Sequence, residues 1–104
     1  MQTDVLEIQS PAPGTQLLLQ VLRFGTPGTG SKAYIQGALH ADEVPAILVT
    51  RQLARQLAEL EAQGEIHGEI VLVPFANPIG MAQHVLGAHQ GRFDVRDGSN
   101  FNRE

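Results

Sequence analysis

The sequence has 104 residues, of which 42% are hydrophobic and 17% charged, a balance typical of one small folded domain rather than of a disordered chain. Seven Lys and Arg are scattered along a chain of net charge −4, so we expect neither nucleic acid nor a membrane surface as a partner. The absence of cysteine excludes disulfides, thiolate metal sites and thiol nucleophiles, so any metal ligand must be His, Asp or Glu.

No targeting or membrane-spanning segment is apparent in the sequence. Residues 1–10 lack the basic and apolar regions of a signal peptide. No apolar run approaches the ~20 residues that a membrane-spanning helix needs. We therefore expect a cytoplasmic protein, with residues 1–104 forming a single domain.

The first half of the chain alternates apolar runs with turn-rich breaks. Segments 10–15 and 25–32 are rich in Pro and Gly, which interrupt strands. They separate three expected strands, at 4–9, 16–24 and 32–39, of which the first two pair across the intervening turn.

Residues 44–63 show the spacing of an amphipathic helix. Its expected apolar face consists of Ala46, Val49, Leu53, Leu57 and Leu60. Pro45 suits the first turn, where its missing N–H removes no intrahelical bond.

A run of consecutive apolar residues at 68–76 predicts a strand that is covered on both faces. Strand, helix and strand make a βαβ unit, so we expect a three-layer α/β/α fold whose mixed sheet is antiparallel at its N-terminal side. Residues 87–104 are expected to form polar loops.

His40 and Glu43 stand where the third strand gives way to the helix. The carboxyl ends of strands in open α/β sheets are where ligands bind, and an imidazole and a carboxylate are ligands that zinc favours. A plainer interpretation is also open, in which Asp42 and Glu43 only support the start of the helix and His40 is a satisfied polar residue. Of the other histidines, His67 is expected at the surface, and His84 or His89 is a weaker candidate for a third ligand.

Three motifs follow one another along the chain: "GALHADEVPA" (37–46), "VLVPFANPIGMAQ" (71–83) and "GRFDVRDGSNFNR" (91–103). Together they resemble the succinylglutamate desuccinylase/aspartoacylase family, a branch of the zinc carboxypeptidase-like fold. The resemblance runs from about residue 30 to the end of the chain.

The resemblance implies roles for five residues. His40 and Glu43 would be two zinc ligands, although Ala41 replaces the glycine of the usual H-G-D/N-E motif. Arg92 would polarise the scissile carbonyl, with Arg96 as the alternative. Asn102 and Arg103 would grip a substrate carboxylate, a task that suits the planar fork of arginine.

The resemblance also implies a zinc-dependent deacylase that hydrolyses the amide bond of an N-acyl amino acid or a related small amide. In that family the third zinc ligand, a histidine, and the glutamate base lie well downstream of the "NR" motif. We therefore expect residues 1–104 to be the N-terminal part of a larger catalytic domain, inactive in isolation and self-associating as a homo-oligomer through an exposed sheet edge. A zinc carboxypeptidase acting on peptides and a non-catalytic binding module remain the alternatives.

Overall fold

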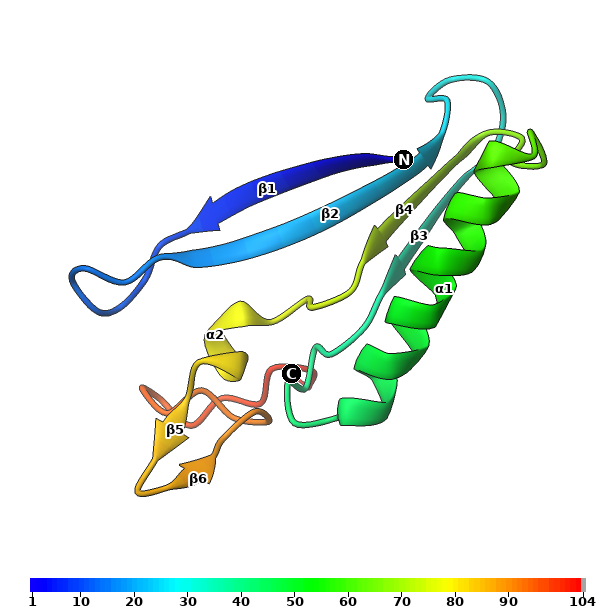
Figure 1. Ribbon diagram of the computed structural model, residues 1–104. Helices are drawn as coiled ribbons and strands as arrows, with labels where there is room; N and C mark the ends of the chain where they lie inside the picture. The colour runs from blue at the N-terminus through cyan, green and yellow to red at the C-terminus, as the bar shows by residue number, and fades with distance from the viewer. Residues whose placement is uncertain (104) are drawn as a thin grey trace.

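The computed structural model describes residues 1–103, which form a mixed α/β fold (Figure 1). The elements in chain order are β1 (Gln2–Ile8), β2 (Leu17–Gly25), β3 (Lys32–Gln36), α1 (Val44–Ala62), β4 (Glu69–Val73), α2 (Pro78–Met81), β5 (His84–Val85) and β6 (Ala88–His89). The short elements α2, β5 and β6 were not expected from the sequence, because each is too brief to show a hydrophobic period.

The main sheet has the strand order β1-β2-β4-β3. β1 pairs with β2, and β2 with β4, in antiparallel fashion, whereas β3 and β4 are parallel. The expected mixed sheet and the β3–α1–β4 unit are therefore confirmed. Within residues 1–103 one long helix covers one face of the sheet, so the described part supplies two of the three expected layers.

One part of the core lies between α1 and the sheet, and a second lies on the opposite face of the sheet, around Val21, Val71 and Val73. Phe24 of β2 and Leu72 of β4 are fully buried and pack with Leu22 and with Leu57 of the helix. Burying side chains of this size contributes about 1.5–3 kcal/mol each. This contact fixes the helix against the strands whose ends carry the candidate site.

The helix is rotated from the face that the sequence predicts. Val49 and Leu60 are 66% and 42% exposed, while Thr50 is buried against the sheet. A Cβ on Gly37 would lie only 2.6 Å from Cγ2 of Thr50. Small residues on both sides thus allow a close approach that a larger side chain would block, and this approach decides which face of the helix is buried.

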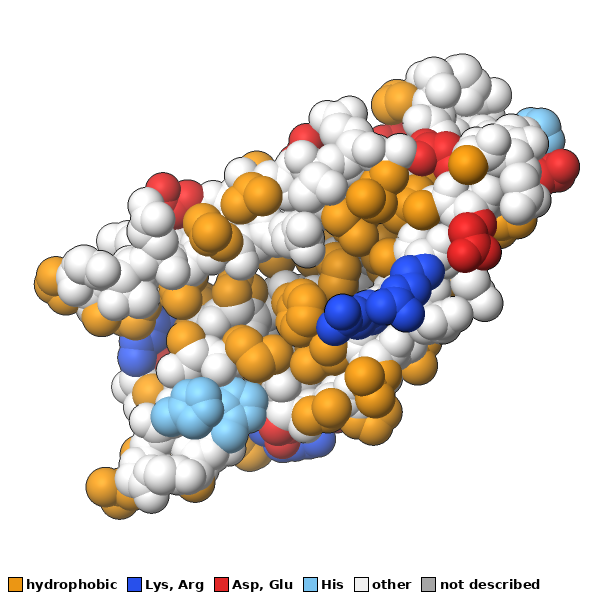
Figure 2. Space-filling view, viewed as in Figure 1, with side chains coloured by type: hydrophobic (Ala, Val, Ile, Leu, Met, Phe, Trp, Pro, Cys, Tyr) orange, Lys and Arg blue, Asp and Glu red, His pale blue; other side chains and the backbone are white. Residues whose placement is uncertain are grey.

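Part of the apolar surface is not covered by residues 1–103. Figure 2 shows hydrophobic side chains gathered in a hollow between the sheet and α1, where a groove is lined by residues of β2, of α1 and of the segment after β4: Gln20, Leu22, Arg51, Ala54, Pro74 and Phe75. Self-association through an exposed sheet edge stays a prediction. Across the described residues, no helix combines the length and apolarity needed to cross a bilayer.

The carboxyl ends of β3 and β4 meet at one edge of the sheet, because the two strands are parallel. The segments that follow them, together with α2, the β5–β6 hairpin and the C-terminal loop, gather at this end of the molecule (Figure 1). The chain therefore brings residues near 40 and residues near 100 together.

Candidate metal centre

The turn that carries His40 leaves the sheet abruptly. Ala38 has a φ of 59°, in the left-handed region that costs a residue with a side chain about 1–3 kcal/mol. The amide of Asn77 secures the turn, since its Nδ2 donates to the carbonyl of Leu39 at 2.9 Å. Strained backbone and a buried anchor together fix the direction in which His40 leaves the sheet.

His40 and Glu43 converge. The imidazole is only 2% exposed, and its Nδ1 lies 3.2 Å from Oε1 of Glu43. Glu43 is the N-cap residue of α1, but its carboxylate makes no hydrogen bond to the backbone N–H groups of the first turn. The carboxylate therefore faces the imidazole instead of capping the helix.

Arg92 joins this pair from a distant loop. Its Nη2 donates to Oε1 of Glu43 at 3.0 Å. The loop is fixed at Gly91, whose carbonyl accepts a hydrogen bond from the N–H of Ala41 at 2.8 Å. A Cβ on Gly91 would lie 2.2 Å from the backbone nitrogen of Asp42, so glycine is what permits this approach.

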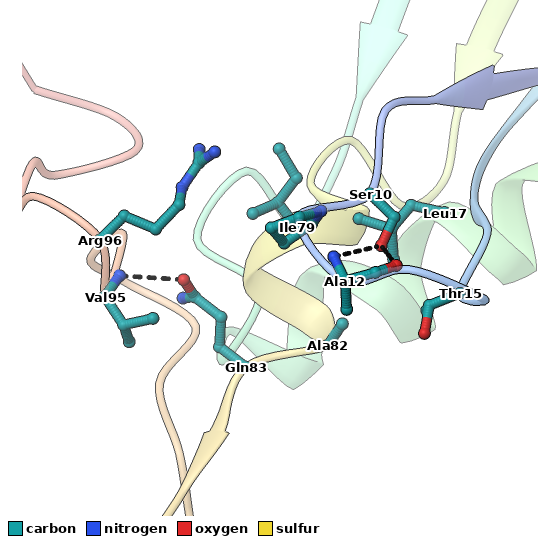
Figure 3. A pocket seen from close by; sticks show the side chains of 10 residues that line it. Ser10, Ala12, Thr15, Leu17, Ile79, Ala82, Gln83, Val95 and Arg96 are labelled. Atoms are coloured by element: carbon teal, nitrogen blue, oxygen red, sulfur yellow. Dashed lines mark hydrogen bonds between the residues drawn. The ribbon is translucent and has the colours of Figure 1, made fainter.

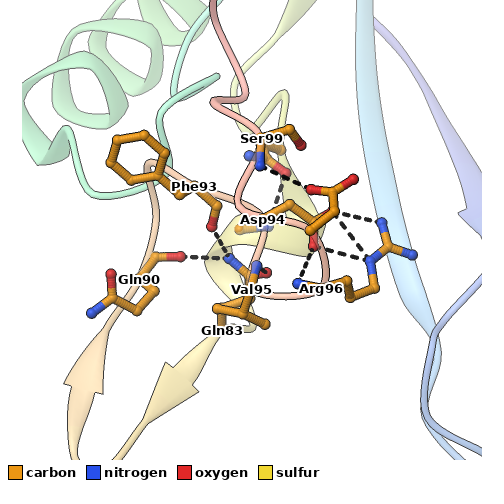
Figure 4. A network of polar contacts seen from close by, with 10 residues as sticks. Gln83, Gln90, Phe93, Asp94, Val95, Arg96 and Ser99 are labelled. Atoms are coloured by element: carbon orange, nitrogen blue, oxygen red, sulfur yellow. Dashed lines mark hydrogen bonds and ion pairs between the residues drawn. The ribbon is translucent and has the colours of Figure 1, made fainter.

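Arg96 has a different environment (Figure 4). Its Nη2 donates to Oδ2 of Asp94 at 2.6 Å, and its backbone N–H donates to Oδ1 at 2.9 Å. The hydrogen bond from the Arg96 guanidinium lowers the pKa of Asp94 to about 2. Between the two candidate arginines, then, Arg92 contacts Glu43, whereas Arg96 is engaged within its own loop.

The side chain of Gln83 holds the same loop together (Figure 4). Its amide bonds three backbone groups, those of Gln90, Phe93 and Val95. Because every one of these bonds is internal to residues 83–95, they stiffen the loop that carries Arg92. A rigid loop is the condition for placing a guanidinium accurately.

The C-terminal segment passes over the other side of the imidazole. Oδ1 of Asn100 lies 2.6 Å from Nε2 of His40. Asn102 and Arg103 are exposed, and the Arg103 guanidinium donates to the backbone carbonyl of Asn102. Sequence reasoning missed Asn100, although it belongs to the same motif as Asn102 and Arg103.

The remaining histidines lie elsewhere. His84 and His89 face each other across the β5–β6 hairpin with ring centroids 5.0 Å apart, and Nε2 of His89 contacts the carbonyl oxygen of Gly80 at 3.0 Å. Throughout residues 1–103 no group of three or more His, Asp or Glu side chains is arranged to hold a metal ion. Neither histidine therefore joins His40 and Glu43 as a third ligand.

One hollow of the structure lies away from this pair. A cavity of about 260 Å³ separates the β1–β2 turn from α2 and is lined by Ser10, Leu17, Ile79 and Arg96 among others (Figure 3). Of the residues that the sequence singles out for metal or substrate, the lining includes Arg96, the alternative to Arg92, but not His40, Glu43 or Arg92. The His40, Glu43 and Arg92 side chains lie instead at the edge of the sheet where β3 and β4 end.

The donor set at the rim fits a divalent metal. An imidazole nitrogen and a carboxylate oxygen meet there, with a guanidinium alongside. Zinc binds both ligand types, and catalytic zinc sites use three protein ligands and leave a position open. Residues 1–103 present two such ligands in one turn of the chain.

The sequence and the structure both match known proteins of one family. Residues 29–104 match the succinylglutamate desuccinylase/aspartoacylase catalytic domain. The structure is similar to that of a succinylglutamate desuccinylase/aspartoacylase family protein from Shewanella amazonensis, with 36% identity and a TM-score of 0.75 over 100% of this chain and 27% of that one. A second protein that carries this family name, from Shewanella frigidimarina, is 28% identical, with a TM-score of 0.71 over 99% of this chain and 27% of that one. No curated protein matches the sequence significantly.

Proposed function

The chain belongs to the succinylglutamate desuccinylase/aspartoacylase family, and we propose that the protein is a zinc-dependent deacylase acting on a small N-acyl amino acid or a related amide. The observation that supports this proposal best is the contact between His40 and Glu43 at the sheet edge, with Arg92 on the same carboxylate. Imidazole and carboxylate are ligands that zinc favours, and a guanidinium can stabilise the negative charge that develops during amide hydrolysis.

His40 and Glu43 would hold the zinc ion. When bound, zinc supplies a Lewis acid that activates water and polarises a carbonyl oxygen near neutral pH. The third ligand and the general base are expected outside residues 1–103. Burial of the imidazole and exposure of the carboxylate leave one side of the pair open to a small molecule.

Arg92 would stabilise negative charge that develops on the substrate. Its guanidinium is partly exposed and reaches the open side of Glu43. A guanidinium has five N–H donors, so Arg92 can keep its bond to Glu43 and still donate to an oxygen of the substrate. The loop bonds of Gln83 and Gly91 hold it in place for that purpose.

Asn102 and Arg103 would bind a carboxylate of the substrate. Both are exposed, and Arg103 has its charge directed at no acidic side chain in the described residues. An arginine fork can make two parallel hydrogen bonds to a carboxylate. An acidic N-acyl amino acid would meet this requirement.

The chain spans 27% of the length of each solved structure that it matches. We propose that residues 1–104 form the first part of a larger catalytic domain, which supplies the missing ligand and base. Cytoplasmic location belongs to the same proposal.

The complete protein that contains these residues provides the test. Its zinc content and its hydrolysis of N-succinylglutamate and N-acetylaspartate are measured for the wild type, His40→Ala and Glu43→Gln. We expect both variants to lose zinc and turnover, whereas the exposed matched controls His67→Ala and Glu59→Gln keep both. Turnover that survives without His40, or release of C-terminal residues from peptides in place of N-acyl hydrolysis, would contradict the proposal.

A further inference from the structure

The hydrogen bonds of Asn100 determine which ring nitrogen of His40 carries the proton. Its Oδ1 accepts the backbone N–H of Asn102 at 2.9 Å and lies 2.6 Å from Nε2 of His40. Because the first of these bonds needs an acceptor, this atom is the carbonyl oxygen of the amide and not its nitrogen. The second contact is then a hydrogen bond only if Nε2 of His40 carries the proton.

The other ring nitrogen, Nδ1, consequently carries no proton and has a free lone pair. A neutral imidazole has one N–H, so with Nε2 protonated Nδ1 has none. Nδ1 nevertheless faces Oε1 of Glu43 at 3.2 Å, and that oxygen already accepts a hydrogen bond from Arg92. Two electron-pair donors therefore point at each other, which is favourable when a cation binds to both.

We propose that Asn100 is a positioning residue, which holds His40 in the tautomer that presents Nδ1 to the metal. This inference rests on the proposed function. A ligating histidine commonly donates its second N–H to a neighbouring group that orients it, and loss of such a partner costs about 10–100-fold in metal affinity.

The position of Asn100 is itself well supported. Asn100 forms an isolated antiparallel β-bridge with Phe93, which lies in the loop of Arg92. The backbone N–H of Phe101 donates to the carbonyl of Arg92 at 3.1 Å. The segment that orients His40 is therefore joined to the segment that carries Arg92. Without the Asn100 acceptor, Glu43 would be the acceptor left for His40, and a proton on Nδ1 would occupy the lone pair that a metal needs.

The test compares Asn100→Leu, which is similar in size but cannot accept a hydrogen bond, with Asn100→Asp, which still accepts one. Asn102→Leu is the matched control, because it makes the same change two residues away and keeps the backbone N–H bonded to Asn100. Zinc affinity is measured on the complete protein by competition with a chromophoric chelator. The protonated nitrogen of His40 is assigned in the metal-free protein from long-range proton–nitrogen NMR correlations.

We expect Asn100→Leu to bind zinc about 10–100-fold more weakly and to shift the His40 proton towards Nδ1, whereas Asn100→Asp and Asn102→Leu stay close to wild type. If Asn100→Leu does not fold, Asn100→Ala makes the same comparison with a smaller side chain. Unchanged affinity and an unchanged tautomer without the Asn100 acceptor would overturn the inference alone. A wild type that binds no zinc would contradict the proposed function, and the NMR comparison would still decide whether Asn100 sets the tautomer.

Discussion

Replacing Gly91 with alanine should separate Arg92 from the metal pair. The added Cβ would lie 2.2 Å from the backbone nitrogen of Asp42 and 2.8 Å from the carbonyl carbon of Ala41. Both are backbone atoms, so no change of rotamer relieves the clash. Reaching an ordinary contact of 3.4 Å requires the two segments to move apart by about 1.2 Å.

This displacement predicts a specific kinetic loss. His40 and Glu43 belong to one turn, so Gly91→Ala should keep its metal when zinc is saturating, but Arg92 should no longer reach Glu43 accurately. A misplacement of about 1 Å at a catalytic site can cost about 10²-fold in rate. We therefore predict that kcat/KM of Gly91→Ala in the complete protein falls about 10²-fold, with zinc content near that of wild type.

Two comparisons make the result decisive. Gly30→Ala is the matched control, since its closest new contact is 3.3 Å and it lies away from the site; its activity should be unchanged. In an Arg92→Met background, Gly91→Ala should add little further loss, because coupled residues are not additive. A Gly91→Ala protein with wild-type kcat/KM, or one that loses as much activity with Arg92 absent, would refute this reasoning.

Three further predictions test the surroundings of the pair. Arg92→Met should lower kcat about 10²–10³-fold without lowering zinc content, whereas Arg96→Met should leave kcat nearly unchanged. Steady-state kinetics of both variants would reverse the assignment of the two arginines if Arg96→Met showed the larger loss. Arg103→Met should raise KM for N-succinylglutamate about 10–100-fold, since a hydrogen bond to a charged group is worth about 1.5–3 kcal/mol; an unchanged KM would remove Arg103 from the substrate site. Arg96 lowers the pKa of Asp94 from 3.8 to about 2, so the stability that Asp94 contributes is present above about pH 4 and is lost as the pH falls towards 2. The melting temperature of the wild type should therefore fall more steeply across this pH range than that of Asp94→Asn, and parallel curves of melting temperature against pH would contradict this.

The fold was predictable where the sequence pattern is long enough to show a period. The antiparallel hairpin, the helix from residue 44 and the buried strand near residue 70 are confirmed within a few residues of each end. β3 ends at Gln36 and not at residue 39, because the chain turns into the left-handed region at Ala38. Hydrophobicity carries no signal for that turn.

The buried face of the helix was predicted wrongly in part. Sequence spacing placed Val49 and Leu60 in the core, but the helix residue that is buried against the sheet is Thr50. Only a small residue fits at position 50, because Gly37 brings the strand backbone close to the helix. The Thr50 hydroxyl can be buried there because it donates to the carbonyl of Ala46 at 3.0 Å. Such a contact joins residues far apart in sequence and cannot be read from one helix alone.

The candidate site was predictable in its residue types but not in its connections. The sequence drew attention to His40, Glu43 and Arg92, and the structure places their side chains in contact. The resemblance favoured Arg92 over Arg96, but the hydrogen bonds that distinguish them could not be read from the sequence, since they depend on Asp94 lying within reach of Arg96. Asn100 was missed for the same reason, because an asparagine in a polar loop shows its role only when its partner is known.

The location of zinc in the complete protein is the most direct test of the claim that His40 and Glu43 converge on one metal. Crystals of the zinc-loaded protein, measured at the zinc absorption edge, should show an anomalous peak about 2.0–2.2 Å from Nδ1 of His40 and from a carboxylate oxygen of Glu43. A peak at the His84–His89 hairpin with none beside His40 would contradict the claim.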